Sequence, residues 1–303
     1  MNAACIDRPF LKSSCLTSLL LFALLPANGA AAEPSLASVF GDHMVLQRER
    51  PVQIWGTADA GVELRVSLAG HAAEARSDES GAWSVILPAL SAGGPHRLQL
   101  SGPGGVVRTV DDILAGEVWL CSGQSNMEYP VRHLNEPWRD TQNPPPTIRL
   151  LTVGHDHSTR PLSAFRKAEG WTVAQPDAVA EFSAACYLFA RELQQTLDVP
   201  FGLIDASWGG SAIEPWISAA GLAQLGGFDD RLKLLRTWDT DPAGTVTRFA
   251  NGWQDWWQSA GGASPGPWSE GFDDSDWALA PAGLGSYQDW PDAGTAGHLG
   301  MIW

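Results

Sequence analysis

The pattern of apolar residues changes at Ile113, and this change limits the folds open to the chain more than any other feature of the sequence. Between residues 33 and 112, apolar and polar residues alternate in short runs, as in residues 62–68. That alternation is the period of a strand with one buried face. Residues 113–121 are almost continuously apolar, which is typical of a parallel strand buried on both faces. The sequence therefore predicts a β-domain followed by an α/β domain.

Short runs with the composition of strands follow one another through the first part, separated by turn residues such as Gly-Gly-Pro at 93–95. The runs are residues 52–55, 62–68, 83–87, 97–100 and 106–110. Strands at such regular spacing predict a small antiparallel β-sandwich over residues 33–112. Its histidines stand alone in the sequence, so we assign this domain no catalytic role.

The second part contains two further predicted strands and a predicted helix. The strands are residues 147–153 and 201–206, and between them residues 181–197 place apolar side chains on one helical face. A strand, a crossover helix and a second strand form a βαβ unit with a parallel sheet. The loops that contain Ser125 and Gly209-Gly210 are then expected at the carboxyl edge of the sheet, where open α/β sheets bind their ligands.

Ser125 lies at the predicted turn from a buried strand into a helix. Free backbone N–H groups and the helix dipole at such a turn can stabilise the oxyanion that forms when a serine attacks an ester. Gly209 and Gly210 let a second backbone segment approach and offer another N–H donor. The turn is not the nucleophile elbow of α/β-hydrolases, because Met127 stands where that pattern has glycine. The pattern predicts acyl transfer by Ser125, with simple helix capping by its side chain as the alternative.

Four ordered segments carry a family resemblance. They are Ser38-Val-Phe-Gly-Asp-His-Met-Val-Leu-Gln47, Val118-Trp-Leu-Cys-Ser-Gly-Gln-Ser-Asn-Met-Glu128, Phe182-Ser-Ala-Ala-Cys-Tyr-Leu-Phe-Ala-Arg-Glu-Leu193 and Ala206-Ser-Trp-Gly-Gly-Ser-Ala-Ile-Glu-Pro-Trp216. Together they resemble the sialate O-acetylesterases and their bacterial relatives in the SGNH hydrolase superfamily. The resemblance implies a flavodoxin-like three-layer catalytic domain behind the β-sandwich, and the hydrolysis of acetyl esters on sugars.

The resemblance also implies roles for individual residues. Ser125 matches the nucleophile, and the N–H groups of Ser125 and Gly209 match the oxyanion hole, with Gly210 as the alternative if the register shifts by one. The superfamily's Asp-x-x-His base and the Gln-Gly-Glu block of the relatives are absent from the sequence. We expect His133, His155 and His157 to be surface loop residues, so the catalytic His and Asp stay unassigned. A serine without a base is a weak nucleophile, and the chain as given is expected to be inactive or nearly so.

The last part of the chain is rich in tryptophan, with eight of the 15 Trp residues from Trp238 onward. The sequence Phe-Asp-Asp-Ser-Asp-Trp at 272–277 resembles the opening of the jelly-roll sandwiches that bind sugars in β-galactosidase-type enzymes. We therefore expect residues 251–303 to begin such a module, inserted in the catalytic domain, with the chain ending inside it. The alternative is a natural chain that has lost catalysis and serves as a carbohydrate-binding protein.

The N-terminus has the pattern of an export signal over residues 1–32, with an anchor helix as the alternative. Arg8 and Lys12 precede a short apolar run, and small residues follow it. We expect a secreted or periplasmic protein with no membrane span after cleavage. The mature chain would keep Cys121 and Cys186, which we expect to be buried free thiols, with a disulfide as the alternative.

The formal net charge of -15 argues against a nucleic-acid partner, because phosphate binding needs clustered Lys and Arg. No His, Cys and Asp residues have the spacing of metal ligands, and no cofactor is implied. The expected organisation is a signal (1–32), a β-sandwich (33–112), the first half of a hydrolase domain (113–250) and the start of an inserted module (251–303). The sequence does not specify the acetylated sugar or the oligomeric state.

Overall fold

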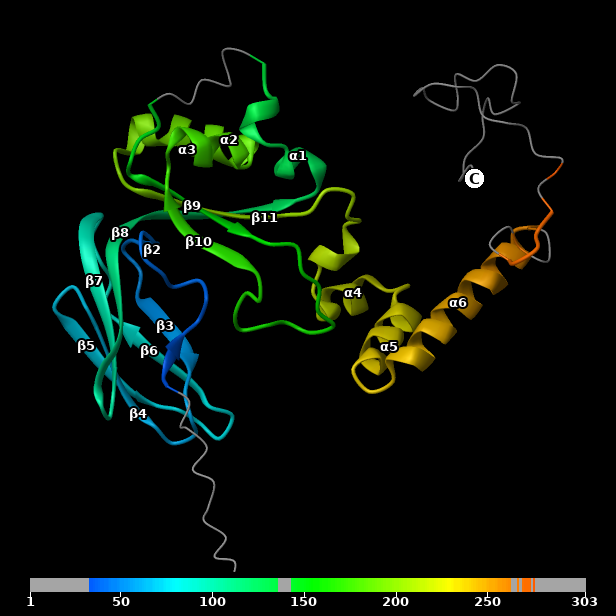
Figure 1. The fold of residues 1–303 in the computed structure, drawn as a ribbon, viewed down its shortest axis with the longest axis horizontal. Coiled ribbons are helices and arrows are strands. Elements are labelled where there is room, and N and C mark those ends of the chain that lie inside the picture. The colour runs from blue at the N-terminus through cyan, green and yellow to red at the C-terminus, as the bar shows by residue number, and fades with distance from the viewer. Residues whose placement is uncertain (1–32, 136–142, 263–265, 267–268, 274, 276–303) are drawn as a thin grey trace, which may run out of the picture. The chain divides into compact units, whose positions relative to one another are not determined.

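The computed structural model describes residues 33–135, 143–262, 266, 269–273 and 275 (Figure 1). The predicted signal and residues 276–303 of the predicted inserted module lie outside the described residues. The chain forms two compact units. Unit 1 comprises Met1–Ser122, Asn126–Gly154 and Ser163–Ser207, and unit 2 comprises Gly123–Ser125, His155–Leu162 and Trp208–Trp303.

Unit 1 contains a small and a large β-sheet. The small sheet has the order β1-β3-β6, with β1 Ser35–Leu36, β3 Val52–Thr57 and β6 Ala82–Leu87. The large sheet has eight strands, in the order β10-β9-β11-β8-β7-β4-β5, and β2 also pairs with β8. Its strands are β2 Val45–Gln47, β4 Glu63–Leu68, β5 His71–Arg76, β7 Gly93–Gly102, β8 Gly105–Gly123, β9 Ile148–Val153, β10 Ala168–Val173 and β11 Phe201–Ser207.

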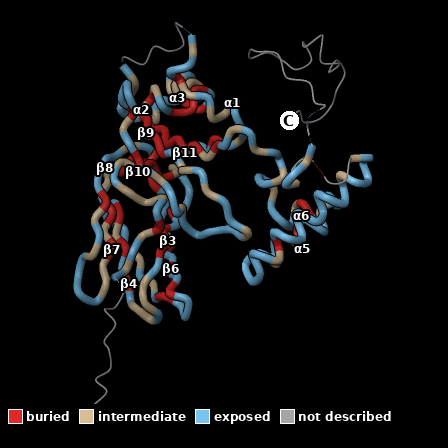
Figure 2. Tube along the Cα trace, turned by 45° about the vertical axis from the view of Figure 1, so that its right-hand side comes forward, coloured by how far each residue is buried: buried red, intermediate tan, exposed pale blue. Residues whose placement is uncertain are grey.

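The strands predicted in the first part of the chain are confirmed, because the alternation in their sequence is also the alternation of their burial. In β6, for example, Trp83, Val85 and Leu87 are buried while the residues between them are exposed. Side chains from both sheets, such as Ile54 and Leu98, belong to one apolar core. The burial of these strands is visible as red segments in Figure 2.

Strand β8 passes through the point where the sequence pattern changes. Up to Ala115 it pairs antiparallel with β7. Beyond that point the Glu117 N–H donates to the Pro200 carbonyl, and the Trp208 N–H donates to the Gly123 carbonyl. The residue numbers of both strands rise together from the first of these hydrogen bonds to the second. This half of β8 therefore runs parallel to β11, as predicted. The prediction that residues 113–121 are buried on both faces of the sheet was wrong, because the Leu120 side chain is 66% exposed.

Helices α2 (Pro176–Glu181) and α3 (Ala184–Leu197) cover one face of β9 and β11 (Figure 1). Strands β9 and β11 are parallel neighbours, and β10 pairs antiparallel with the other side of β9. The predicted helix over 181–197 is divided at Phe182, whose ψ of 160° is extended. The Ser183 side chain accepts the Cys186 N–H and begins α3, as a serine N-cap does. The described chain is therefore a mixed α/β structure with a central mixed sheet.

Cys121 and Cys186 form a disulfide, so the expectation of free thiols was wrong. Cys121 lies on β8 and Cys186 in the first turn of α3, and both side chains belong to the core beneath that helix. Their Cα atoms are 5.9 Å apart, within the usual range for a disulfide. The two cysteines are 65 positions apart in the sequence, which gave no sign of this proximity.

Unit 2 contains the 3-10 helix η2 (Glu214–Trp216) and three helices, α4 (Ala219–Leu225), α5 (Asp229–Trp238) and α6 (Pro242–Ser259). Residues 251–259 are therefore helical and do not begin a β-sandwich. Helix α6 starts where the Asp241 side chain accepts the Gly244 N–H, continues through Gly252 and ends at Ser259, just before Gly261-Gly262. Val246, Phe249, Trp253 and Trp256 of this helix are exposed, and most of the α6 trace is coloured as exposed in Figure 2. No helix in the described part of the chain has the length and apolar character needed to cross a membrane.

Asp112 joins two basic side chains at a strained point of β8. Its carboxylate accepts from Arg149 Nη1 at 2.6 Å and from His43 Nδ1 at 2.7 Å. Arg149 is buried, with 7% of its side chain exposed, whereas the Asp112 side chain is 37% exposed. Both Asp112 and His43 have positive φ, at 53° and 68°. This ion network is therefore expected to hold the turn at His43, β8 and β9 together.

Replacing Asp112 by Asn is expected to lower the free energy of unfolding at pH 7 by about 3 kcal/mol, because a buried guanidinium loses its counter-charge. The Arg149 hydrogen bond, helped by His43, holds the Asp112 pKa below its ordinary value. A lowered carboxyl pKa contributes stability that is complete above the ordinary value near 4 and is lost as pH falls through the folded pKa. Urea unfolding at pH 7 and pH 3 should show a large difference between wild type and variant at pH 7 and a smaller one at pH 3.

Asp111→Asn is the matched control, because Asp111 pairs with Arg97 and both side chains are more than half exposed. Exposed pairs contribute about 1 kcal/mol or less. Equal losses in Asp111→Asn and Asp112→Asn would show that the burial of Arg149 has no energetic consequence.

Candidate active site

Ser125 is the first residue of the short helix α1 (Ser125–Glu128), and β8 ends two residues before it at Gly123. Gly123 has a φ of +146°, a conformation that a residue with a side chain rarely adopts. The Ser125 side chain is exposed, and its Oγ donates to Gln124 Oε1 at 2.9 Å. Because α1 has four residues, the expected contribution of a helix dipole is small, and individual backbone N–H groups have to supply any stabilisation.

A second loop of unit 2, which follows β11, lies against residues 123–125. The Trp208 N–H donates to the Gly123 carbonyl at 2.8 Å, and the Gly210 N–H donates to Ser125 Oγ at 3.4 Å. The latter distance is long for a hydrogen bond, as is common for catalytic donors in unliganded sites. The structure thus brings Ser125 and Gly210 together, as the rule for sheet edges predicts.

The same loop is fixed by side-chain hydrogen bonds further along. Ser211 Oγ donates to the Trp208 carbonyl at 2.7 Å, and Trp216 Nε1 donates to Ser211 Oγ at 2.9 Å. Gly210 has a φ of +76°, which glycine adopts without strain. These contacts hold the backbone around Gly209 and Gly210 beside the candidate nucleophile.

An aromatic pair next to this loop was missed by the sequence reasoning. The rings of His155 and Trp208 are stacked, with centroids 4.5 Å apart and planes 2° from parallel. Their positions carried a signal, because His155 follows β9 and Trp208 follows β11, which are adjacent and parallel. Residues that follow neighbouring parallel strands meet at one sheet edge.

Among the described residues, the hydrogen bonds of Ser125 Oγ join it to Gln124 and Gly210, and neither of these is an imidazole or a carboxylate. His133, His155 and His157 are exposed, as expected. The described contacts of the Ser125 hydroxyl are thus with a side-chain amide and a backbone donor. Within the same residues, no group of His, Cys, Asp and Glu side chains is arranged to hold a metal ion.

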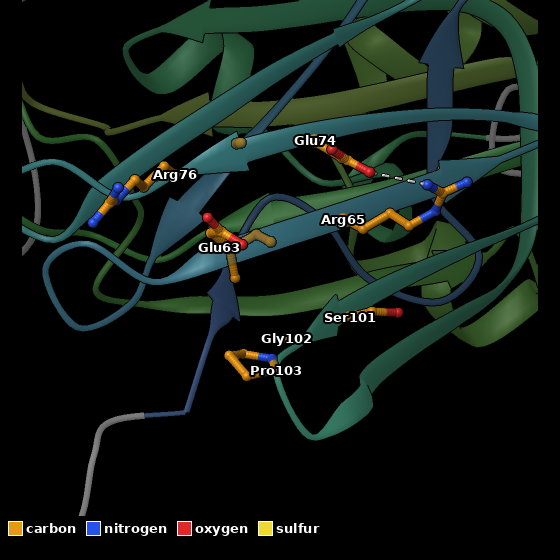
Figure 3. Close-up of a pocket in the computed structure, with 9 residues that line it drawn as sticks. Glu63, Arg65, Glu74, Arg76, Ser101, Gly102 and Pro103 are labelled. Atoms are coloured by element: carbon orange, nitrogen blue, oxygen red, sulfur yellow. Dashed lines mark hydrogen bonds and ion pairs between the residues drawn. The ribbon is translucent and has the colours of Figure 1, made fainter.

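A groove of about 600 Å³ lies on the exposed face of β4, β5 and β7 in unit 1 (Figure 3). In its walls Glu63 lies opposite Arg76 and Arg65 opposite Glu74 across the two strands, and Arg65 Nη1 is 3.2 Å from Glu74 Oε1. Opposite charges on neighbouring strands stabilise a solvated sheet face. The groove residues are therefore explained by the sheet, and none of them belongs to the loops around Ser125.

Comparisons with known proteins place the chain near acetylesterases. The sialate O-acetylesterase of Rattus norvegicus is 30% identical over 226 residues, which cover 69% of this chain and 42% of that enzyme. The sialate O-acetylesterase of Homo sapiens is 32% identical over 211 residues, which cover 63% of this chain and 40% of that enzyme. The chain thus spans about two fifths of the length of these curated relatives. No protein-family model matches the sequence.

A solved structure is also similar. The crystal structure of a carbohydrate acetylesterase from Xanthomonas citri has a TM-score of 0.59 and 37% sequence identity to this chain. The match covers 62% of this chain and 43% of that protein.

Proposed function

The chain belongs to a sialate O-acetylesterase-like family, and on this premise we propose that the protein is an exported esterase that removes O-acetyl groups from sugars. The observation that supports this best is the Gly210 N–H donating to Ser125 Oγ beside a glycine turn. An oxyanion hole requires backbone donors beside the nucleophile, where the carbonyl oxygen of the bound ester would lie, and this contact places the Gly210 N–H next to Ser125. The finer fold that we propose is the first part of an SGNH hydrolase domain.

In the proposed reaction Ser125 Oγ bonds to the acetyl carbonyl carbon, and the carbonyl oxygen becomes an oxyanion. The N–H of Gly210, with those of Gly209 and Ser125, would stabilise that charge. The oxyanion collapses, the bond to the sugar oxygen breaks, and the sugar hydroxyl leaves with a proton. Water then attacks the acetyl-serine, releasing acetate and restoring the Ser125 hydroxyl. The proton transfers need a base, which none of the described residues supplies to Ser125.

Export, which we propose from the pattern of residues 1–32, is supported by the Cys121–Cys186 disulfide. Disulfides persist in oxidising compartments and are rare in the cytosol. The proposed location is therefore the periplasm or the medium, and the proposed partner is an acetylated carbohydrate.

The test measures acetate release by the complete gene product from O-acetylated sialic acid, acetylated xylan and acetylated monosaccharides. We expect acetate from at least one of them, with the sugar chain left intact. A second candidate, a carbohydrate-binding protein without catalysis, is favoured by the Ser125 hydroxyl donating to an amide oxygen instead of a base. Binding of the acetylated sugars with no acetate released above the buffer rate would overturn the esterase and support this candidate.

A further inference from the structure

The stacked pair of His155 and Trp208 lies at the start of the loop that carries Gly210. Both side chains are exposed, yet their planes differ by only 2° and their centroids are 4.5 Å apart. The two rings come from separate loops of unit 2. The stack therefore ties the Trp208 loop to a second segment of the chain at a point where solvent is accessible.

Trp208 is held through its backbone as well as its ring. Its N–H donates to the Gly123 carbonyl, and its carbonyl accepts from Ser211 Oγ. Two glycines lie between Trp208 and Ser211, and glycine has little conformational preference of its own. The direction of the Gly210 N–H therefore depends on the positions of Trp208 and Ser211, which flank the two glycines.

We propose that His155 is a positioning residue for the candidate oxyanion donor: its ring, packed flat on Trp208, holds the Gly210 N–H beside Ser125 Oγ, next to the place where an oxyanion would form. The contribution is the shape and area of the ring, and proton transfer has no part in it. Ser125 Oγ donates to Gln124 Oε1 instead of an imidazole nitrogen, as this assignment requires. The kinetic consequence rests on the proposed function, whereas the effect on loop order does not.

The test compares His155→Phe, which keeps a ring but carries no titratable nitrogen, with His155→Ala, which removes the ring. In the complete gene product, His155→Ala is expected to lower kcat for acetate release about 10- to 100-fold, because displacing a donor by about 1 Å has effects of this size. His155→Phe should stay within about 3-fold of wild type, and KM should change less than kcat in both. Equal losses in the two variants would overturn the proposal, because the imidazole nitrogens and not the area of the ring would then be what the activity needs.

A second measurement needs no activity. Hydrogen–deuterium exchange of the peptide that covers residues 207–216 should be faster in His155→Ala than in wild type, and close to wild type in His155→Phe. The urea midpoint should be the same in all three proteins. A wild type that releases no acetate but shows this exchange pattern would reject the esterase and keep the stacking role. Unchanged exchange in His155→Ala would reject the stacking role whatever the activity.

Discussion

Ser125→Ala is expected to lower kcat for acetate release by about 10³-fold or more in the complete gene product, with KM changed by less than about 3-fold. Removing a serine nucleophile leaves only the rate that binding and oxyanion stabilisation provide. The substrate should still bind, because the Ser125 side chain is exposed and its hydroxyl contacts only Gln124 and Gly210. Initial rates of acetate release over a range of acetylated substrate concentrations measure both constants.

Ser122→Ala is the matched control for this prediction. Ser122 is an exposed serine three residues earlier, at the end of β8, and it should retain the wild-type rate. Wild-type kcat in Ser125→Ala would rule out acyl transfer through this hydroxyl, even if acetate release itself were confirmed. A loss in both variants would indicate that the loop, and not the nucleophile, was damaged.

Local periodicity predicted most strands correctly because it reports the burial of one face, which is a property of consecutive residues. Strands β4 and β6 follow the predicted runs almost residue for residue. Strand β10 was missed because Trp171 is its only buried residue, so no alternation marks this strand at the edge of the sheet. The helix over 181–197 was predicted too long at its start, because α2 ends at Phe182 in an extended conformation and Ser183 caps the start of a separate helix, α3.

For residues 251–259, the resemblance of the segment that follows them was a poorer guide than local periodicity. Residues 251–259 were assigned to a β-module because of the aromatic sequence that follows them, yet they continue α6. The spacing of Phe249, Trp253 and Trp256 is that of a helix face and gave the correct signal. The tryptophans thus mark a helix here, and local spacing was the better guide to their structure.

The sequence predicted that the two loops of the candidate site would meet, but it left two glycines open as the backbone donor. Ser125 and the glycine pair follow strands that are neighbours in one sheet, and that relation can be inferred from a βαβ pattern. The N–H bonded to Ser125 Oγ is that of Gly210, which the resemblance implied as the alternative to Gly209. The sequence does not tell which of two adjacent glycines directs its N–H toward the serine, because the two residues are chemically identical. Contacts between distant segments, such as the stack of His155 on Trp208, depend on the same information.

Removing the Cys121–Cys186 disulfide is expected to lower the free energy of unfolding by about 4 kcal/mol, the loop-entropy value for a bond that spans roughly 65 residues. This is a large share of the roughly 5–15 kcal/mol by which domains are stable. The bond joins α3 to β8 at Cys121, four residues before Ser125. Without the bond, the end of β8 that leads to the candidate nucleophile should also be less firmly held. Urea unfolding of the Cys121→Ala/Cys186→Ala double variant, beside wild type, measures the loss.

A reductant supplies the control for this disulfide prediction. The wild type should lose stability in a phosphine reductant until it approaches the double variant, because opening the bond restores the entropy of the unfolded chain. The double variant should unfold at the same urea concentration with and without reductant, which also reports any contribution of the other two cysteines, Cys5 and Cys15. Mass spectrometry of alkylated peptides shows whether Cys121 and Cys186 have been reduced. A reduced wild type as stable as the oxidised one would mean that the packing between β8 and α3 suffices without the covalent link.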